Sequence, residues 1–258
     1  WEEDYGEDSD FFRVRVRGLP PNASDAQYID SARVMAAQTR VVQVLDDEPL
    51  IAGCDLSWGG AALSVIRFRR GADARSIPPI KIPGALTADP AVLTNRLADV
   101  LTATYGGRKV AMLFLDAAGT AGPIAVRLRT LGHRNIIEVN FGADSPDPKC
   151  RYYRDFMWRE GKTWLATGAI DKDPRLEIDL QTPGLRPDRK QRVWLESKED
   201  IKKRLEGRST DDSDALVLTF AAKVGLPKGA GGRRGPKGRG RFEGRGGASG
   251  SGLGWTHL

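Results

Sequence analysis

The order of apolar segments from residue 49 onward constrains the fold of this chain most. Three short apolar runs come first and are separated by turn residues: "PLIAGCDLS", "ALSVIRFRRG" and "SIPPIKIPG". Such runs predict three strands in an antiparallel meander. Helix-like and strand-like segments then alternate. This order predicts an α/β fold with a mixed sheet flanked by helices.

The later segments are assigned by their hydrophobic spacing and flanking residues. Strands are expected at "KVAMLFLD" and "NIIEVNFG", and helices at "DPAVLTNRLADVLTATYGG", "GPIAVRLRTLGH" and "YYRDFMWREGKTWLATG". Two polar strands around "RLEIDL" and "RKQRVWLES" then predict an added β-hairpin. Two helices, "KEDIKKRLEG" and one following Ser209, close the folded body.

The ends of the chain differ from its body in composition. Residues 1–48 look like a connecting region, with a short strand at "FFRVRVRG" and a helix in "AQYIDSARVMAAQTR". Residues 49–226 form the predicted domain. Residues 227–258 carry seven Lys or Arg and one Glu among many glycines. The resulting charge of these residues, +6, equals the net charge of the whole chain. We expect this Gly/Arg-rich tail to be disordered and to follow nucleic acid phosphates through its clustered arginines.

Several classes of site and location are excluded by composition. The two cysteines and two histidines are too few for a Cys/His zinc cluster or a disulfide framework. A bound metal would therefore need carboxylate ligands, which favours Mg²⁺ or Mn²⁺. No apolar run approaches the roughly 18 residues of a membrane span, and no signal peptide is apparent. We expect no membrane partner and no secretion.

Aspartates stand at three separated places where an apolar segment would be buried. Asp55 lies in the first strand and Asp116 ends a later one, "AMLFLD". With Ser209 as N-cap, helix capping explains Asp211 and Asp212, but Asp214 lies beyond the free N–H groups. A buried lone carboxylate costs several kcal/mol unless it is paired, protonated or bound to metal.

Two of these aspartates also have a simpler explanation. Asp116 could turn the chain through its own backbone hydrogen bonds, and a cationic partner for Asp55 could come from elsewhere in the chain. Taken together, three acids from distant segments predict a site for two divalent ions that cleaves phosphodiester bonds. Nearby basic segments would hold the DNA backbone. The candidate DNA-binding residues are Lys190, Arg192, Lys198, Lys202, Lys203 and Arg208, with Arg233 and Arg234 in the tail.

The ordered series of motifs resembles the nuclease domain of the large terminase subunit of tailed bacteriophages. It includes "VRVRGLPP", "GCDLSWGG", "MLFLDAAGTAGPIAVRLRTLG", "VNFGA", "RDFMW" and "LESKEDIKKRLEGRSTDDSDALVLTFA". The resemblance implies a ribonuclease H-like, mixed five-stranded sheet. It implies catalysis by Asp55, Asp116 and Asp214, and binding of two Mg²⁺ or Mn²⁺ ions by these residues and Asp211.

The same resemblance implies a biological setting. Such a domain cuts concatemeric double-stranded DNA when packaging starts and ends, in the cytoplasm of the infected bacterium. Its partners would be DNA, an upstream ATPase domain, the small terminase subunit and the portal. This chain lacks the ATPase phosphate-binding loop, so we expect it to be the nuclease part of a longer protein.

Two alternatives remain open, and the first rests on a departure from the family pattern. Ala61 and Ala62 stand where members of the family often carry further acids. The chain could therefore be a degenerate nuclease that only binds DNA, held by its Arg/Gly tail. A junction resolvase of the same fold also ends in an Asp-x-x-Asp helix, but it lacks the entry region and the "SKEDIKKRLEGRS" stretch.

Overall fold

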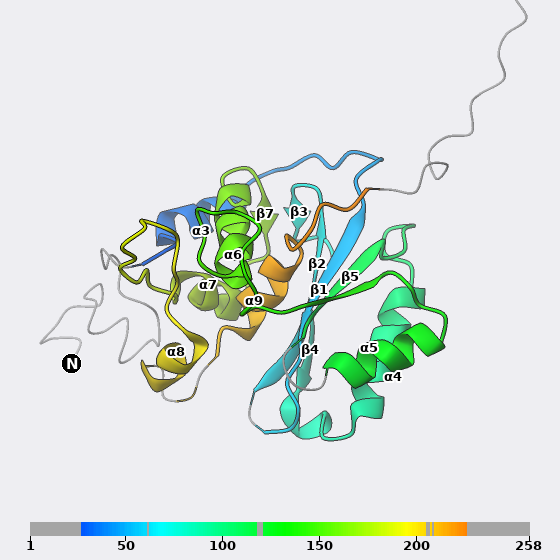
Figure 1. Ribbon diagram of the computed structural model, residues 1–258. Coiled ribbons are helices and arrows are strands. Elements are labelled where there is room, and N and C mark those ends of the chain that lie inside the picture. The colour runs from blue at the N-terminus through cyan, green and yellow to red at the C-terminus, as the bar shows by residue number, and fades with distance from the viewer. Residues whose placement is uncertain (1–26, 61, 118–120, 205–206, 208, 226–258) are drawn as a thin grey trace, which may run out of the picture. The chain divides into compact units, whose positions relative to one another are not determined.

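The computed structural model of the protein describes residues 27–60, 62–117, 121–204, 207 and 209–225 (Figure 1). All of these residues belong to one compact unit, which ends at Leu226. The strand predicted at "FFRVRVRG", the residues Arg208, Arg233 and Arg234, and the Gly/Arg-rich tail lie outside the described residues.

The described residues form a seven-stranded mixed sheet in the order β6-β5-β1-β2-β3-β7, with β4 also paired to β2. The predicted meander is present, because β1 and β4 both pair antiparallel with β2. Strand β5 lies parallel to β1, and β6 lies parallel to β5. The five predicted strands are thus found, with two additional strands of two residues each. The bounds are β1 Leu50–Asp55, β2 Leu63–Arg70, β3 Asp73–Ala74, β4 Ile80–Pro83, β5 Met112–Asp116, β6 Ile136–Val139 and β7 Ala169–Ile170.

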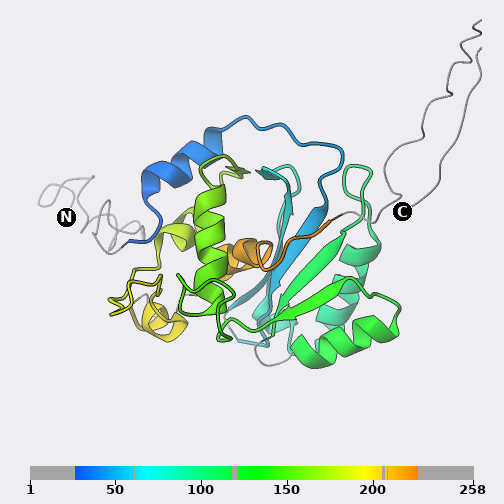
Figure 2. The ribbon, with the colours of Figure 1, turned by 45° about the horizontal axis from the view of Figure 1, so that its top comes forward.

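Helices cover both faces of the sheet, as Figures 1 and 2 show from two directions. Helices α4 (Pro90–Thr102) and α5 (Ala121–Thr130) cover one face. On the other face, α9 lies directly against β1 and β2, and α6 and α7 pack on α9. The bounds on this side are α3 Ser31–Thr39, α6 Tyr153–Trp164, α7 Pro174–Gln181 and α9 Asp211–Leu218; the short helices η1 (Gly84–Leu86) and α8 (Lys198–Arg204) complete the body.

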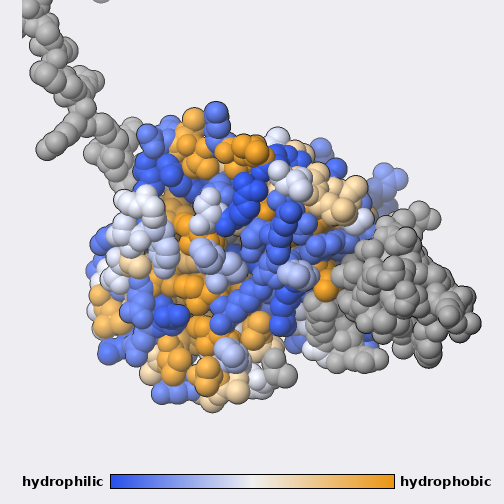
Figure 3. Space-filling model, turned by 180° about the vertical axis from the view of Figure 1, so that it is seen from behind, coloured by the Kyte–Doolittle hydropathy of each residue, from blue (hydrophilic) through white to orange (hydrophobic). Residues whose placement is uncertain are grey.

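Each face of the sheet has its own hydrophobic core. Side chains alternate along a strand, so Leu50, Ala52 and Cys54 of β1 pack with α4 and α5, while Ile51 packs with α6 and α9. Seen from the side opposite Figure 1, hydrophilic and hydrophobic residues lie side by side on the surface (Figure 3). None of the described helices combines the length and apolar character that crossing a membrane requires.

The predicted hairpin is wrong in its first half. The segment "RLEIDL" lies in helix α7, not in a strand. Asp173 caps this helix by accepting a hydrogen bond from the backbone N–H of Arg175, and Pro174 occupies its first turn. This start signal outweighs the strand-like alternation that follows it. The second half keeps a short antiparallel pairing, in which Leu185 bridges to Leu195 and Arg186 donates its N–H to the carbonyl of Trp194.

Candidate active site

The alternation of side chains brings Asp55 and Asp116 together on the α9 side of the sheet. Ile51, Gly53 and Asp55 alternate with the residues of β1 that face α4 and α5. In β5, Phe114 packs in the core under α6 and α9, and Asp116 follows two positions later. Parallel pairing of Cys54 with Leu115 places the two aspartates at neighbouring strand ends. Ligands of α/β sheets bind at such carboxyl ends.

Helix α9 completes the set of acids. It begins at Asp211 with Thr210 as N-cap, one residue later than predicted, so Asp211 is its first residue and Asp214 its fourth. The helix approaches β1 very closely at Gly53. A Cβ atom at Gly53 would lie 2.1 Å from the carbonyl oxygen of Ala215. Glycine at this position is therefore what allows α9 to carry Asp214 up to the strand ends.

The three aspartates surround the ammonium group of Lys198, the first residue of α8. Its Nζ lies 3.1 Å from Oδ2 of Asp55, 3.1 Å from Oδ2 of Asp214 and 3.6 Å from Oδ2 of Asp116. Asp55 and Asp116 are 5% exposed and Asp214 is fully buried. Lys198 is thus the cationic partner that the sequence analysis allowed for Asp55, and it also pairs with Asp116 and Asp214. We call Asp55, Asp116, Asp214 and Lys198 the carboxylate cluster.

Crowding of like charges perturbs the cluster. Burial, together with the charges of Asp214, Asp116 and Asp211, raises the pKa of Asp55 to about 8 against the opposing effect of Lys198. Burial alone would lower the pKa of Lys198, but the three carboxylates outweigh it and raise that pKa. Lys198 therefore stays charged. One ammonium does not fully compensate three buried carboxylates.

Helix α6 holds Asp214 in place through the motif "RDFMW". Nε1 of Trp158 donates a hydrogen bond of 2.9 Å to Oδ1 of Asp214, and Nε of Arg154 lies 3.5 Å from the same oxygen. Oγ1 of Thr210 donates to the other oxygen at 2.9 Å. Burial would raise the pKa of Asp214, but Lys198, Arg154 and these hydrogen bonds outweigh it and lower that pKa. Asp214 is therefore fixed as a carboxylate.

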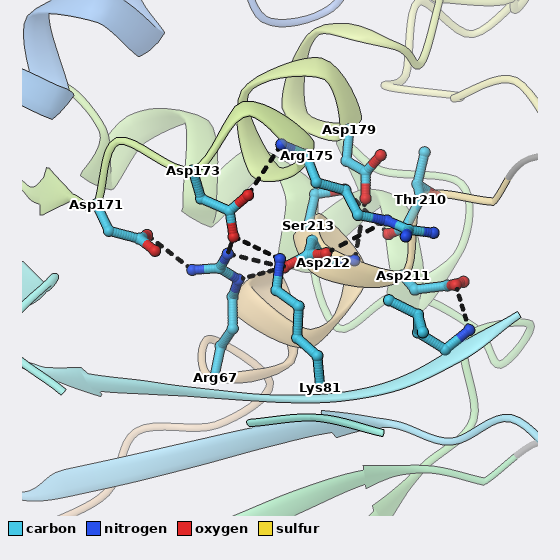
Figure 4. Close-up of polar contacts among 11 residues, drawn as sticks. Arg67, Lys81, Asp171, Asp173, Arg175, Asp179, Thr210, Asp211, Asp212 and Ser213 are labelled. Atoms are coloured by element: carbon cyan, nitrogen blue, oxygen red, sulfur yellow. Dashed lines mark hydrogen bonds and ion pairs between the residues drawn. The ribbon is translucent and has the colours of Figure 1, made fainter. Parts of the chain in front are cut away.

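Asp211 lies beside the cluster and differs from the other three acids. Its Oδ2 accepts a hydrogen bond of 3.2 Å from the backbone N–H of Leu63 in β2 (Figure 4). It is 5% exposed, and its charge contributes to the raised pKa of Asp55. The predicted group of four acids is therefore close in space, with three of them directly on Lys198.

A second network, which the sequence did not reveal, fixes the start of α9. Fully buried Asp212 accepts hydrogen bonds from Nε and Nη2 of Arg67 in β2, at 3.1 and 2.7 Å, and lies 2.9 Å from Nζ of Lys81 (Figure 4). Asp179 of α7 accepts the backbone N–H of Asp212 at 3.0 Å. Asp212 is thus a structural anchor with buried ionic partners. Arg67 also pairs with Asp171 and Asp173.

The predicted DNA-binding residues fall into three groups. Lys190, Lys202 and Lys203 are exposed, and Arg192 forms an ion pair with Asp188. Lys198 instead lies in the carboxylate cluster, with 25% of its side chain exposed. Arg208, Arg233 and Arg234 are outside the described residues.

The carboxylate cluster has the chemistry of a divalent cation site, with a lysine at its centre. As the described residues stand, no three Asp, Glu, His or Cys side chains are arranged to hold one ion. The reason is visible in the cluster, where an ammonium takes the place of a metal between the carboxylates. All three acids offer oxygen, which Mg²⁺ and Mn²⁺ prefer. The three carboxylates therefore offer the donor atoms that such an ion requires.

Comparison with solved structures identifies the fold. The nuclease domain of the large terminase subunit gp2 of bacterial virus Sf6 superposes with a TM-score of 0.56 at 14% identity, over 76% of this chain and 99% of that one. The large terminase nuclease from thermophilic phage G20c with bound cobalt gives a TM-score of 0.51 at 13% identity, over 77% and 98%. This is the fold of a phage terminase nuclease domain.

Of the comparisons with known proteins, the comparison of structures found this likeness. No protein-family model matches the sequence, and the search of curated proteins found no match. Among the solved terminase nuclease domains, the Sf6 domain also has a structure with manganese and beta-thujaplicinol, to which this chain is similar with a TM-score of 0.55. The ribonuclease H-like fold predicted from the motifs is confirmed.

Proposed function

We propose that this protein is a metal-dependent endonuclease that cuts double-stranded DNA, with Asp55, Asp116 and Asp214 as its catalytic residues. One observation carries the proposal, which is the convergence of these three buried carboxylates on a single cation at the strand ends. The fold, shared with terminase nuclease domains, supports it. Asp211 would accompany them as a ligand for two Mg²⁺ or Mn²⁺ ions.

The residues of the chain prepare the site for this chemistry. Divalent ions held by the acids would activate a water molecule and stabilise the charge on the leaving oxygen. Trp158 and Thr210 orient both oxygens of Asp214, so this carboxylate is already positioned. Lys198 compensates part of the negative charge of the acids. With a divalent ion in its place, its ammonium would be free to donate to a DNA phosphate, which accords with its predicted role in DNA binding.

We place this activity in the packaging of viral DNA. A terminase nuclease cuts concatemeric DNA at the start and end of packaging, in the cytoplasm of the bacterial host. The upstream ATPase domain, the small terminase subunit and the portal would be its partners. In this proposal residues 1–48 connect to the ATPase, residues 49–226 cut the DNA, and the tail from residue 227 binds it.

A plasmid-nicking assay tests the proposal. With Mn²⁺ or Mg²⁺ the protein should convert supercoiled plasmid to nicked and linear forms, and EDTA should stop the reaction. Asp55→Asn, Asp116→Asn and Asp214→Asn should each abolish nicking, because each removes a ligand charge with almost no change in volume. Asp46→Asn is the matched control, since Asp46 is fully exposed and remote in the structure from these contacts.

The outcomes separate the alternatives. Circular dichroism must show that the Asn variants remain folded. Full activity in all three variants would rule out the carboxylate cluster as the catalytic site. Binding without any cutting by the unmodified protein would favour the degenerate DNA-binding module, and a preference for four-way junctions over linear duplex would favour a resolvase.

A further inference from the structure

A pocket of about 350 Å³ opens beside the carboxylate cluster and is not used by the mechanism above. Asp116 and Lys198 belong to its lining, so the pocket is continuous with the proposed active site. Three aromatic residues, Phe141, Tyr152 and Trp194, also line it. They come from the residues after β6, the start of α6 and the segment before α8.

The walls of this pocket are tied together. Asp155 of the "RDFMW" motif accepts the backbone N–H of Tyr152 at 3.0 Å with one oxygen. Its other oxygen accepts the backbone N–H of Leu195 at 3.0 Å. Asp155 is almost completely buried. A single carboxylate therefore fixes the wall formed by Tyr152 relative to the wall formed by Trp194, and the pocket is preformed.

Cations lie on the aromatic rings around the pocket. The guanidinium of Arg151 lies 3.8 Å from the centre of the Trp194 ring, and Nζ of Lys198 lies 4.8 Å from that of Phe141. Arg154 also lines the pocket and is buried. Its Nη2 has no hydrogen-bond partner among the described residues, whereas its Nε faces Asp214 at 3.5 Å. Arg151 also lies 5.2 Å from the centre of the Tyr152 ring, and Arg186 lies 5.3 Å from that of Trp194. The pocket thus combines aromatic rings that already accept cations with a buried guanidinium nitrogen that a ligand can use.

We propose that this pocket receives one unpaired nucleobase of the strand being cut. The volume suits a single planar group, since it lies near the lower end of the range for ligand pockets. Bases displaced from a helix stack on aromatic side chains and hydrogen-bond through their edges. A bare phosphate fits less well, because Asp116, Asp155 and Glu199 also line the pocket.

The position of the pocket links the base to the reaction. With a base held beside Asp116 and Lys198, the adjoining phosphate is brought to the carboxylate cluster. This proposal rests on the proposed nuclease function. It adds that the preferred substrate is DNA in which a base is already unpaired, because such a base enters the pocket without the cost of opening the duplex.

Binding of two short duplexes in EDTA tests the pocket without cleavage. One duplex carries a single bulged 2-aminopurine, and the other has the same sequence fully paired. The intact protein should bind the bulged duplex more tightly. Trp194→Ala should weaken binding of the bulged duplex by about 5- to 150-fold, the usual effect of losing one stacking side chain, and change binding of the paired duplex little.

Two further variants keep the test decisive. Trp194→Phe retains an aromatic wall and should keep most of the preference for the bulge. Tyr152→Ala changes a half-exposed side chain on the opposite wall, so it reports on the pocket even where Trp194→Ala disturbs folding. Equal affinity of the intact protein for both duplexes would overturn the proposal. So would an undiminished preference in both Trp194→Ala and Tyr152→Ala.

A parallel nicking assay separates this proposal from the function on which it rests. Nicking without any preference for the bulged duplex would leave the nuclease and refute the pocket. A bulge preference that depends on Trp194, in a protein that does not nick, would support the pocket and refute the nuclease function.

Discussion

At the scale of single residues, Lys198 supplies one positive charge to three buried aspartates. The cluster therefore retains more negative than positive charge if all three aspartates are ionised, and burial together with these neighbouring charges raises the pKa of Asp55. Removing one partner from a buried ionic group usually costs more than the pair contributes, since the remaining charges lose their compensation. The same shortage of positive charge favours a divalent cation.

Lys198→Met should have opposite effects without and with divalent ions. In EDTA the variant should lose about 3 kcal/mol of unfolding free energy, because three carboxylates are left buried without a cation. Added Mg²⁺ or Mn²⁺ should raise the melting temperature of the variant more than that of the unmodified protein. Denaturation with and without the ions measures both effects.

The matched control is Lys190→Met, which removes an exposed lysine. It should change stability by less than about 0.5 kcal/mol in either condition. A melting temperature of Lys198→Met that does not respond to divalent ions would contradict the account of the cluster as a cation site.

The site was partly predictable at this scale. Asp55, Asp116 and Asp214 could be identified because each stands where an apolar segment should be buried. Lys198 was predicted as a DNA-binding residue, but its contact with the aspartates was not, since Asp55 lies 143 positions away in the sequence. Trp158 was visible only as part of a motif, although it donates directly to Asp214.

At the scale of elements, two arginines of β2 bind the two ends of α9 and hold the helix against the sheet. Arg67 binds Asp212 near the start of the helix, and Arg69 donates to Oγ1 and the carbonyl oxygen of Thr219 at its end. The two arginines are two positions apart in a strand, so they point to the same face. Gly53 is the register partner of Arg67 on the neighbouring strand and lies directly under the helix.

Gly53→Ala should displace α9 and weaken the site together with the fold. The added methyl group would lie 2.1 Å from the carbonyl oxygen of Ala215, so helix or strand must move. Overpacking of this kind costs about 1–3 kcal/mol of unfolding free energy. Nicking should fall by more than the loss of folded protein explains, because α9 carries Asp214. Chemical denaturation and the nicking assay measure the two effects.

Gly122→Ala in α5 is the control for this substitution. The nearest atom to a Cβ at Gly122 is 3.9 Å away, and the position is helical. Alanine there should be neutral or stabilise the protein by up to about 1 kcal/mol. Wild-type stability and activity in Gly53→Ala would show that the close contact of α9 with β1 is unimportant.

The helices and strands were predicted best where the sequence carried one pattern and no competing one. The strands β1, β2 and β5 and the helix α4 follow directly from their apolar spacing. The segment from Pro174 to Gln181 carried two signals, an alternating pattern and a capped, proline-led helix start, and the helix prevailed. The two-residue strands β3 and β7 depend on pairing between distant segments, which no local pattern reveals.

At the scale of the whole molecule, charge is divided between the body and the tail. Residues 227–258 hold seven basic residues and one acidic residue, so the remaining 226 residues are balanced. We expect the tail to bind DNA through phosphates, as a complement to the exposed lysines Lys190, Lys202 and Lys203 of the body. Such binding carries no sequence preference.

Deleting the chain from Pro227 should weaken DNA binding and make it less dependent on salt. Each phosphate contact contributes about 0.7–0.9 to the slope of log affinity against log salt, so the slope should become less steep by up to about 6. Fluorescence anisotropy over a salt series measures this change. A variant with the seven basic residues replaced by Gln separates charge from length. Unchanged affinity for DNA at low salt in the truncated protein would show that the tail does not contribute to DNA binding.

The arrangement of the acids along the chain has a consequence for synthesis. Asp55 and Asp116, the first two acids of the cluster, leave the ribosome early. The cluster lacks Lys198 and Asp214 until the last described helix has emerged. If the carboxylate cluster cuts DNA as proposed, an unfinished polypeptide lacks the complete set of acids, and cleavage would begin only once helix α9 has been synthesised.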